Sequence, residues 1–297
     1  MLTIRDLRKT YANGVRALRE VTLDIPRGMF GLLGPNGAGK SSLMRTLATL
    51  QEADAGTAVF DDGAGTRIDV LRDKDAVRRR LGYLPQDFGV YPKVSALDLL
   101  EHFAVLKGIT DRRVRREVVD GLLQQVNLWD VRKRKLGGFS GGMRQRFGIA
   151  QALLGDPRLV IVDEPTTGLD PEERNRFLNL LASIGENVAV ILSTHIVQDV
   201  TDLCPNMAIM NKGRVLLTGR PADAIAALES RIWRKRVPME ALPKYQQAFQ
   251  VLSTRLVQGT PEIHVYAEQD PADGFELIRP DLEDVYFQRL RQHAAAA

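Results

Sequence analysis

The sequence predicts an α/β fold with a mostly parallel sheet that is covered by helices on both faces. Residues 159–162 and 188–192 are continuous apolar runs of strand length, and the segment 171–184 between them has helical spacing. A third apolar run, 29–33, enters a glycine-rich loop that precedes another helical pattern. Buried strands that alternate with helices are typical of parallel sheets, whose strands are apolar on both faces.

Length and composition indicate one main domain with an appendage. The 297 residues are 44% hydrophobic and 26% charged, with a net charge of +4, which is ordinary for a globular protein. We expect the main domain over residues 1–228 and an accessory region over 229–297. No run approaches the roughly 18 to 20 apolar residues of a membrane-spanning helix. Met1 leads directly into a strand pattern rather than a secretory signal, so we expect a cytoplasmic chain.

The N-terminal part of the chain predicts strands followed by one helix. Residues 1–26 indicate two or three strands, with a turn at 12–14. Leucines at helical spacing predict a helix over 41–50. The segment 52–80 is irregular and rich in glycine and aspartate, with short strands expected around 58–61.

The middle of the chain predicts helices. Apolar stripes indicate helical structure between 94 and 126, first through Leu97, Leu100 and Ala104 and later through Val114, Val118 and Leu122. Residues 141–154 predict another helix, and a hairpin at 211–214 with a short helix after Pro221 closes the main domain. From about residue 231 the patterns are mixed, which predicts a small α+β appendage.

The cysteine and histidine content argues against several kinds of metal site. The single cysteine, Cys204, excludes an internal disulfide, and its apolar neighbours predict a small buried thiol. His102, His264 and His293 have no companions at ligand spacing, so we assign them no metal role.

A glycine-rich loop at 34–41, with the sequence GPNGAGKS, fits the pattern G-x-x-x-x-G-K-[ST] between a predicted strand and a predicted helix. Its glycines let backbone N–H groups converge on a β-phosphate, and the following helix adds the partial positive charge of its N-terminus. Lys40 would reach the β- and γ-phosphates, and the Ser41 hydroxyl would ligate Mg²⁺. The residues expected to bind the nucleotide are Gly34, Asn36, Gly37, Ala38, Gly39, Lys40, Ser41 and Ser42.

Two adjacent carboxylates, Asp163 and Glu164, follow the buried run 159–162, at the sheet edge where parallel sheets bind ligands. Asp163 would hold Mg²⁺ through water. Glu164 would polarise the water that attacks the γ-phosphate, a role that contributes about 100- to 10,000-fold in rate. Together with the loop at 34–41, these carboxylates predict hydrolysis of a nucleoside triphosphate.

Residues 139–146, with the sequence FSGGMRQR, open a predicted helix and resemble the signature motif of ABC-transporter nucleotide-binding subunits. Further segments match that family's order over about the first 225 residues, with two departures in the signature itself: Phe139 stands for a leucine and Met143 for a glutamine. The residues that correspond to other family motifs are Tyr11 (adenine stacking), Gln86 (glutamine loop), Asp170 (aspartate loop) and His195 (switch histidine).

The resemblance implies a P-loop NTPase core with an N-terminal antiparallel subdomain and a helical subdomain over about 88–155. It also implies ATP and Mg²⁺ as ligands, catalytic roles for Glu164, His195 and Gln86, and a metal site of Ser41, Gln86 and Asp163. In this family the signature of one subunit, here Ser140, Gly141 and Gly142, covers the γ-phosphate held by the other. Because every motif is intact, a homodimer is expected, although a heterodimer with an equally complete partner would look the same.

The same resemblance implies a separate transmembrane permease as the partner, reached from the cytoplasmic face of the membrane. The segment 88–107 resembles the subdomain whose groove takes the permease's coupling helix, with Phe88, Tyr91 and Leu97 as candidate contacts. Residues 280–287, PDLEDVYF, resemble a segment near the C-terminus of bacterial export-type ATPases. The transported substrate cannot be inferred, because its pocket lies in another polypeptide.

Three other functions are disfavoured. A soluble ABC ATPase acting on ribosomes or nucleic acid would carry a second cassette, coiled coils or zinc inserts, and the basic clusters at 112–116, 132–135 and 234–236 lack interleaved aromatics for base stacking. We therefore expect no nucleic acid partner. In a GTPase, Arg214 in the sequence NKGR would have to be the aspartate that reads guanine. An ATP-dependent kinase would have no use for the signature.

Overall fold

The computed structural model describes residues 1–297 except 62, 64, 87–88, 90, 187 and 296–297. The chain forms two compact units. The first comprises Met1–Pro205 and Met210–Val215, and the second comprises Asn206–Ile209 and Leu216–Ala297. The boundary between a main domain and an accessory region that the sequence suggests near residue 228 stays a prediction.

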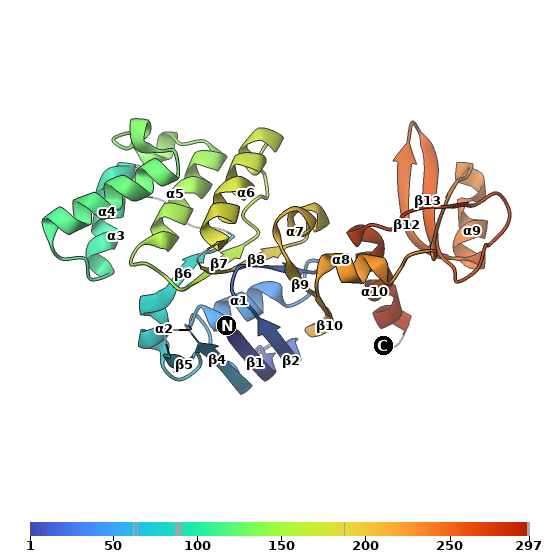
Figure 1. The fold of residues 1–297 in the computed structure, drawn as a ribbon, viewed down its shortest axis with the longest axis horizontal. Coiled ribbons are helices and arrows are strands. Elements are labelled where there is room, and N and C mark those ends of the chain that lie inside the picture. The colour runs from blue at the N-terminus through green and yellow to red at the C-terminus, as the bar shows by residue number, and fades with distance from the viewer. Residues whose placement is uncertain (62, 64, 87–88, 90, 187, 296–297) are drawn as a thin grey trace. The chain divides into compact units, whose positions relative to one another are not determined.

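An antiparallel sheet in the order β2-β1-β4-β5 begins the first unit (Figure 1). Its strands are β1 (Leu2–Thr10), β2 (Arg16–Ile25), β4 (Ala55–Asp61) and β5 (Arg67–Asp69). Along β2 the buried side chains Leu18, Val21, Leu23 and Ile25 fall at the spacing of a half-buried strand with an irregularity in its register. The predicted turn at 12–14 joins β1 to β2, and the backbone N–H of Gly14 donates to the carbonyl of Tyr11 over 2.9 Å. The N-terminal antiparallel subdomain is confirmed.

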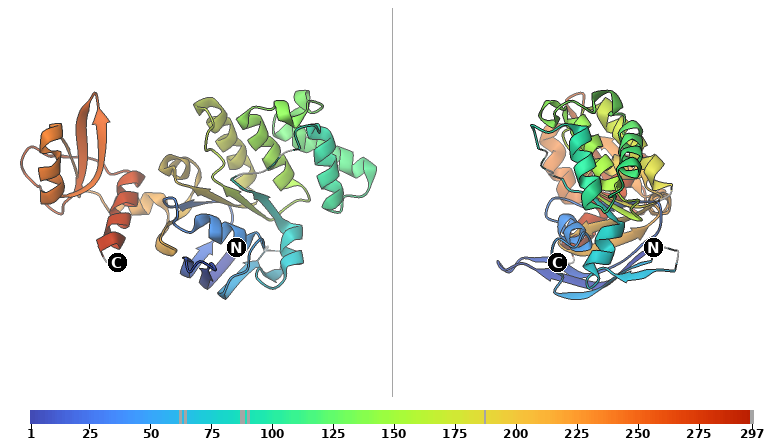
Figure 2. Two further views of the ribbon diagram at one scale, coloured as in Figure 1. Left: turned by 180° about the vertical axis from the view of Figure 1, so that it is seen from behind. Right: turned by 90° about the vertical axis from the view of Figure 1, so that its left-hand side faces the viewer.

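A parallel sheet in the order β3-β8-β7-β6 forms the centre of the same unit. Its strands are β3 (Met29–Leu33), β6 (Leu81–Leu84), β7 (Leu159–Asp163) and β8 (Ala189–Thr194), and every residue of β3, β7 and β8 is buried. Helix α1 (Lys40–Leu47) lies between this sheet and the antiparallel sheet. Helices α5 (Gly141–Leu153), α6 (Pro171–Gly185) and α7 (Val197–Leu203) lie on the opposite side (Figures 1 and 2). The predicted α/β fold with a parallel sheet covered on both faces is therefore confirmed.

The predicted helical stretch between 94 and 126 is two helices, α3 (Ala96–Leu106) and α4 (Arg112–Gln125). Two short 3₁₀ turns, Trp129–Val131 and Leu136–Gly138, lead from them to α5. The predicted apolar stripe of α4 was wrong by one position. Val119 and Leu123 are fully buried, the predicted Val118 and Leu122 are half-buried, and Val114, in the exposed first turn of α4, is 50% exposed.

Three further local features differ from the sequence predictions. Helix α1 ends at Leu47 rather than at residue 50, because Thr49 adopts a left-handed backbone with φ of 62°. Helix α2 (Lys74–Arg80) was not predicted, because it is almost entirely charged and buries only Val77. Strand β6 follows α2 directly and was also missed, being only four residues long.

The predicted hairpin joins β9 (Asn206–Asn211) to β10 (Arg214–Gly219) through a turn at Lys212 and Gly213. These two residues have φ of 46° and 78°, the positive values that a tight two-residue hairpin turn requires. The short helix expected after Pro221 is α8 (Pro221–Ala226).

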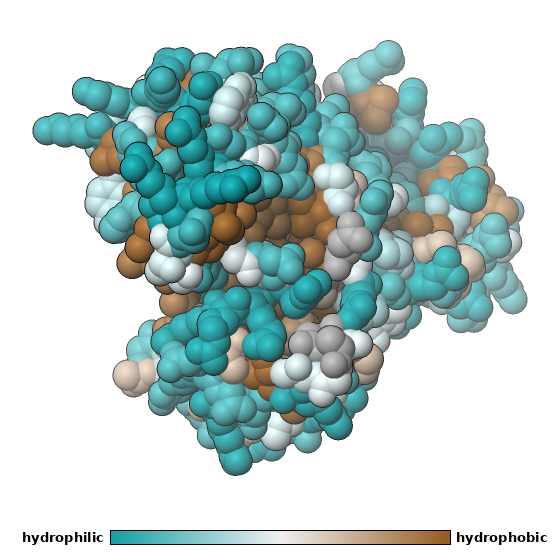
Figure 3. Space-filling model, turned by 60° about the vertical axis from the view of Figure 1, so that its left-hand side comes forward, coloured by the Kyte–Doolittle hydropathy of each residue, from teal (hydrophilic) through white to brown (hydrophobic). Residues whose placement is uncertain are grey.

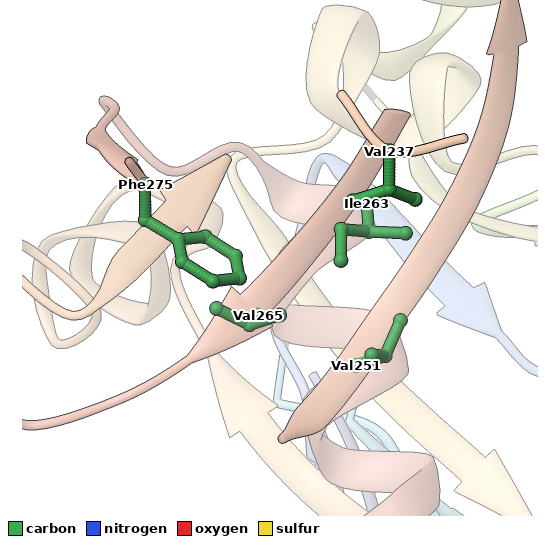
Figure 4. Packing of buried hydrophobic residues seen from close by; sticks show 5 residues of the cluster. All are labelled: Val237, Val251, Ile263, Val265 and Phe275. Carbon is green, nitrogen blue, oxygen red and sulfur yellow. The ribbon is translucent and has the colours of Figure 1, made fainter. Parts of the chain in front are cut away.

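The second unit has its own antiparallel sheet, in the order β12-β13-β11-β14. Its strands are β11 (Ile232–Arg236), β12 (Gln250–Val257), β13 (Thr260–Tyr266) and β14 (Glu276–Leu277). A 3₁₀ turn (Met239–Ala241), α9 (Leu242–Ala248) and α10 (Leu282–Ala295) complete the α+β appendage. Figure 4 shows its separate core, which consists of Val237, Val251, Ile263, Val265 and Phe275.

The remaining expectations from composition concern the thiol and the membrane. Cys204 is 4% exposed, and burial, helped by the nearby charge of Asp199, raises the pKa of its thiol to about 12. It is the small buried thiol that its neighbours predicted. Within the described part of the chain, no helix combines the length and the apolar character that a membrane crossing demands.

Candidate active site

A cavity of about 960 Å³ opens at the carboxyl end of β3, where the antiparallel sheet meets the glycine-rich loop. It brings together most of the residues that the sequence assigned to the nucleotide. The predicted residues that line it are Tyr11, Asn36, Gly37, Ala38, Gly39, Lys40, Ser41, Ser42, Gln86 and Glu164. Gly34 is not part of the lining, but its carbonyl accepts a hydrogen bond from Lys40.

The loop between β3 and α1 is shaped by close backbone approaches that leave no room for side chains. A Cβ at Gly34 would lie 2.5 Å from the carbonyl oxygen of Met210, and one at Gly39 would lie 2.5 Å from that of Ala17. Gly39 also has a φ of 103°, which L-residues rarely adopt. The backbone N–H of Gly213, from the hairpin turn, donates to the carbonyl of Ala38 over 2.9 Å and holds the loop from the other side.

Lys40 lies at the centre of the site and is only 4% exposed. Its ammonium donates to the carbonyls of Gly34 (2.6 Å) and Pro35 (3.3 Å) and forms an ion pair with Glu164 Oε1 at 3.3 Å. Sequence reasoning assigned Lys40 and Glu164 to separate tasks and did not predict this pair. The ion pair places Lys40, predicted to bind phosphate, next to Glu164, predicted to polarise the attacking water.

Glu164 is held in place by its backbone as well as by its partners. It follows β7 directly and has a left-handed φ of 46°, a conformation that is uncommon for a non-glycine residue and that concentrates at functional sites. Its N–H donates to the carbonyl of Ser193 over 2.9 Å, which ties it to β8. Its second carboxylate oxygen lies 3.1 Å from Nδ1 of His195, the residue after β8. Neighbouring parallel strands therefore deliver both predicted catalytic side chains to one place.

Asp163 ends β7 and is 3% exposed, and among the described residues its Oδ1 has no hydrogen-bond partner. Its charge contributes, after burial, to a raised pKa of the neighbouring Tyr83. A buried carboxylate oxygen without a partner is costly unless a cation or water completes it. The hydroxyl of Ser41 and the amide of Gln86 line the adjacent cavity, so the donor set fits a hard cation such as Mg²⁺.

Tyr11 and Gln86 both line the cavity. The phenol of Tyr11 donates to Gln51 Oε1 at 3.0 Å and lies 2.9 Å from the hydroxyl of Ser42. Both contacts fix the ring at the end of β1, where it can present a face to a base. The basic residues Arg16, Arg19 and Lys212 also line the cavity and were missed, because single cations on a strand and in a turn carry no sequence signal.

The signature residues and Asp170 form a second cluster at the N-termini of α5 and α6. Ser140 caps α5 by accepting from the N–H of Met143 (3.2 Å), and Asp170 caps α6 by accepting from that of Glu173 (2.8 Å). A partly buried ion pair between Arg146 and Glu173 joins the two helices. Among the described residues that line the nucleotide cavity, none belongs to this cluster, which comprises Ser140, Gly141, Gly142 and Asp170.

A separate hollow of about 480 Å³ lies between α2, β6, α3 and α5. Figure 3 shows hydrophobic surface inside a hollow on the face of the first unit that bears these helices. Its apolar lining residues are Leu81, Phe103, Leu106, Ala152 and Leu154. Of the predicted groove residues, Tyr91 is 63% exposed and Leu97 is half-buried, and neither is among the described residues that line this hollow. Phe88 lies outside the described residues.

Sequence comparisons match most of the chain to known proteins. The family model described as "ABC transporter" matches residues 18–167. The daunorubicin/doxorubicin resistance ATP-binding protein DrrA of Streptomyces peucetius is 34% identical over 268 residues, which cover 89% of this chain and 77% of that protein. The ABC transporter ATP-binding protein NatA of Bacillus subtilis is 33% identical over 225 residues, which cover 74% of this chain and 89% of NatA.

Solved structures agree with these matches. A dimeric structure of a post-hydrolysis state of the ATP-binding cassette MJ0796, bound to ADP and Pi, superposes with a TM-score of 0.66 at 26% identity. The match covers 74% of this chain and 98% of that one. CbiO1 from Clostridium perfringens, part of the ABC transporter complex cbiONQ, gives a TM-score of 0.67 at 28% identity and covers 76% and 90%.

Proposed function

The chain belongs to the ABC transporter family as an ATP-binding and ATP-hydrolysing subunit of a transporter, and from this premise we propose that two copies close over two ATP molecules to drive a separate membrane permease. The observation that carries the proposal is the separation of Lys40 from Ser140 within one chain. Lys40 lies in the nucleotide cavity, whereas Ser140 caps α5 outside it. A second copy would supply the missing side of the γ-phosphate site.

Within each site, the Lys40 ammonium would exchange its partner Glu164 for the phosphates of ATP. The carboxylate, once released from Lys40, would accept a hydrogen bond from the attacking water and polarise it. His195 already uses Nδ1 toward Glu164, so its Nε2 would be the atom that bonds the γ-phosphate. Tyr11 would stack on the adenine.

Ser41, Asp163 and Gln86 would hold Mg²⁺ at this site, in keeping with the unpartnered Oδ1 of Asp163 among the described residues. The bound ion would neutralise charge on the β- and γ-phosphate oxygens. The protein's part would be to position these three side chains, of which Ser41 and Gln86 line the cavity.

We further propose that the partner is a transmembrane permease, which this chain binds at the cytoplasmic face of the cell membrane, and that the complex works in the direction of export. Two features support this. The drug-resistance relative from Streptomyces peucetius aligns over most of both chains, including residues beyond the first unit. The apolar hollow beside α3 would take a short segment of the permease. Residues 229–297 would then be an accessory region of this ATP-hydrolysing subunit.

Replacing His195 by alanine should slow ATP hydrolysis far more than it weakens ATP binding. The side chain is 43% exposed and contacts Glu164, so its loss leaves the fold intact but removes one of the groups that align the attacking water. Loss of a positioned catalytic group typically lowers the rate by about 100-fold or more. Steady-state hydrolysis and equilibrium ATP binding, measured on the same preparation, would test it. An unchanged rate would refute the role.

The permease assignment is tested by co-purification of the tagged chain from detergent-solubilised membranes of cells that express it. Recovery of an integral membrane protein in stoichiometric amount supports the proposal. Recovery of ribosomes in its place would overturn it. The variant Leu106→Asp is the useful control, because Leu106 is 69% exposed and lines the apolar hollow. It should lose the membrane protein while keeping ATP hydrolysis.

A further inference from the structure

Asp199 is a fully buried carboxylate that contacts the segments of both predicted catalytic residues, and none of the motifs above includes it. It is in the first turn of α7 and is 0% exposed. Its Oδ2 accepts from the hydroxyls of Thr166 (2.8 Å) and Thr194 (3.4 Å). Its Oδ1 accepts from two nitrogens of Arg174, Nε at 2.8 Å and Nη2 at 2.6 Å.

The three partners of Asp199 come from three different segments of the active site. Thr166 is two residues after Glu164, and Thr194 is the residue before His195. Arg174 is one turn along α6 from Asp170, and its backbone N–H donates to the Asp170 carbonyl over 2.9 Å. The Thr194 hydroxyl also accepts from the N–H of Ile196 at 3.0 Å, so the turn that carries His195 is closed around the same hydroxyl.

We propose that Asp199 is a positioning residue for ATP hydrolysis, which fixes Glu164 and His195 relative to each other and ties both to the segment of Asp170. Both threonines bond to the same carboxylate oxygen, so the segments that carry Glu164 and His195 cannot move apart without breaking one of these bonds. Asp199 thus fixes the 3.1 Å contact between Glu164 and His195 although it touches neither side chain.

Through Arg174, Asp199 also connects the catalytic pair to Asp170. Asp170 belongs to the cluster at the N-termini of α5 and α6, which under the proposed function faces the second subunit. A shift of the first turn of α6 on dimer closure would move Arg174 and, through Asp199, the catalytic pair. The inference rests on the proposed roles of Glu164 and His195 and deepens them.

A purely stabilising role is the competing explanation, and it predicts a different pattern. A buried ion pair contributes little net stability compared with apolar residues of the same volume, because desolvation offsets the Coulomb attraction. Its value lies rather in fixing geometry, and a misplacement of about 1 Å at a catalytic group can cost 100-fold in rate. A positioning residue should therefore change kcat and leave ATP affinity alone, whereas a stabilising residue should change both together.

The test uses the full chain with Asp199→Asn, and with Thr166→Val and Thr194→Val, which each remove one hydroxyl but no buried charge. The matched control is Asp202→Asn, on the exposed side of the same helix. We expect Asp199→Asn to lower kcat by about 10- to 100-fold with the Kd for ATP unchanged, and each threonine variant to lower kcat less. In the Glu164→Gln background, Asp199→Asn should lower the residual rate no further, since residues that act as a unit are not additive.

Parent-like kcat in Asp199→Asn would overturn the inference, as would parallel losses of ATP binding and hydrolysis. If Asp199→Asn does not fold, the threonine variants decide: parent-like kcat in both of them overturns the inference. The proposed function fails separately, through a parent-like rate in Glu164→Gln. An inactive Glu164→Gln together with a fully active Asp199→Asn would refute only the role of Asp199.

Discussion

Replacing Glu164 by glutamine should lower kcat for ATP hydrolysis by about 100- to 10,000-fold, the usual contribution of a general base. Glutamine has the size of glutamate and can still bond to His195, but its amide cannot take a proton from water. The left-handed turn that directs the side chain into the cavity depends on the backbone bond to Ser193 and not on the carboxylate. The chemistry should therefore be lost while the site keeps its shape.

The same change should leave ATP affinity at least as high as in the parent chain. Glu164 and Lys40 are both largely buried and lie 3.3 Å apart, so the carboxylate competes with the incoming phosphates for the ammonium. Glutamine removes that competition and the repulsion between the carboxylate and the γ-phosphate. Equilibrium ATP binding measured beside single-turnover hydrolysis would separate the two effects.

Glu172→Gln provides the matched control for this experiment. Glu172 is exposed on the first turn of α6 and pairs with Arg176 four residues on, an arrangement that contributes little to stability. Its removal changes the net charge as Glu164→Gln does but leaves the cavity untouched, so hydrolysis should stay at the parent rate. A Glu164→Gln chain that hydrolyses ATP as fast as this control would exclude Glu164 as the base.

The parts of the fold that the sequence predicted are those in which a local pattern and its burial agree. Strands β7 and β8 are apolar at every position up to their polar ends, which only a doubly covered parallel sheet explains. The glycine-rich loop was equally clear, since glycine is required there by close approaches and positive φ. Helix α2 was missed because its charged surface has no apolar period, and its stability comes from a single buried valine and its neighbours.

The sequence predicted most residues of the candidate site, but not Arg16, Arg19 and Lys212 and not the contacts within the site. Lys40 and Glu164 are 124 positions apart in the sequence, and nothing in either segment indicates that they form an ion pair. Asp199 illustrates the same limit. An aspartate in the first turn of a helix is ordinary in a sequence, and only the folded chain shows that two threonines and an arginine from other segments converge on it.

Magnesium-ATP should convert the Glu164→Gln chain from monomer to dimer, with two ATP molecules held between the copies. Ligands shift an equilibrium only by their differential affinity for its states, and the closed dimer would contact each γ-phosphate from both sides. Without hydrolysis the dimer should persist long enough to be measured by sedimentation or light scattering. A chain that stays monomeric at saturating magnesium-ATP would contradict the composite site on which the proposed transport cycle depends.

A carboxylate placed at the signature should block this dimer without harming the monomer. Gly141 is exposed at the start of α5, and a Cβ there would lie 3.8 Å from Leu169, an ordinary contact. Aspartate at this first helical position is favoured by the helix dipole, but in the dimer it would face the γ-phosphate of the other copy and repel it. Adding Gly141→Asp to Glu164→Gln should therefore abolish dimerisation while ATP binding continues. Gly121→Asp, the same change on an exposed position of α4, should dimerise normally, because only the signature is expected to meet a phosphate in trans.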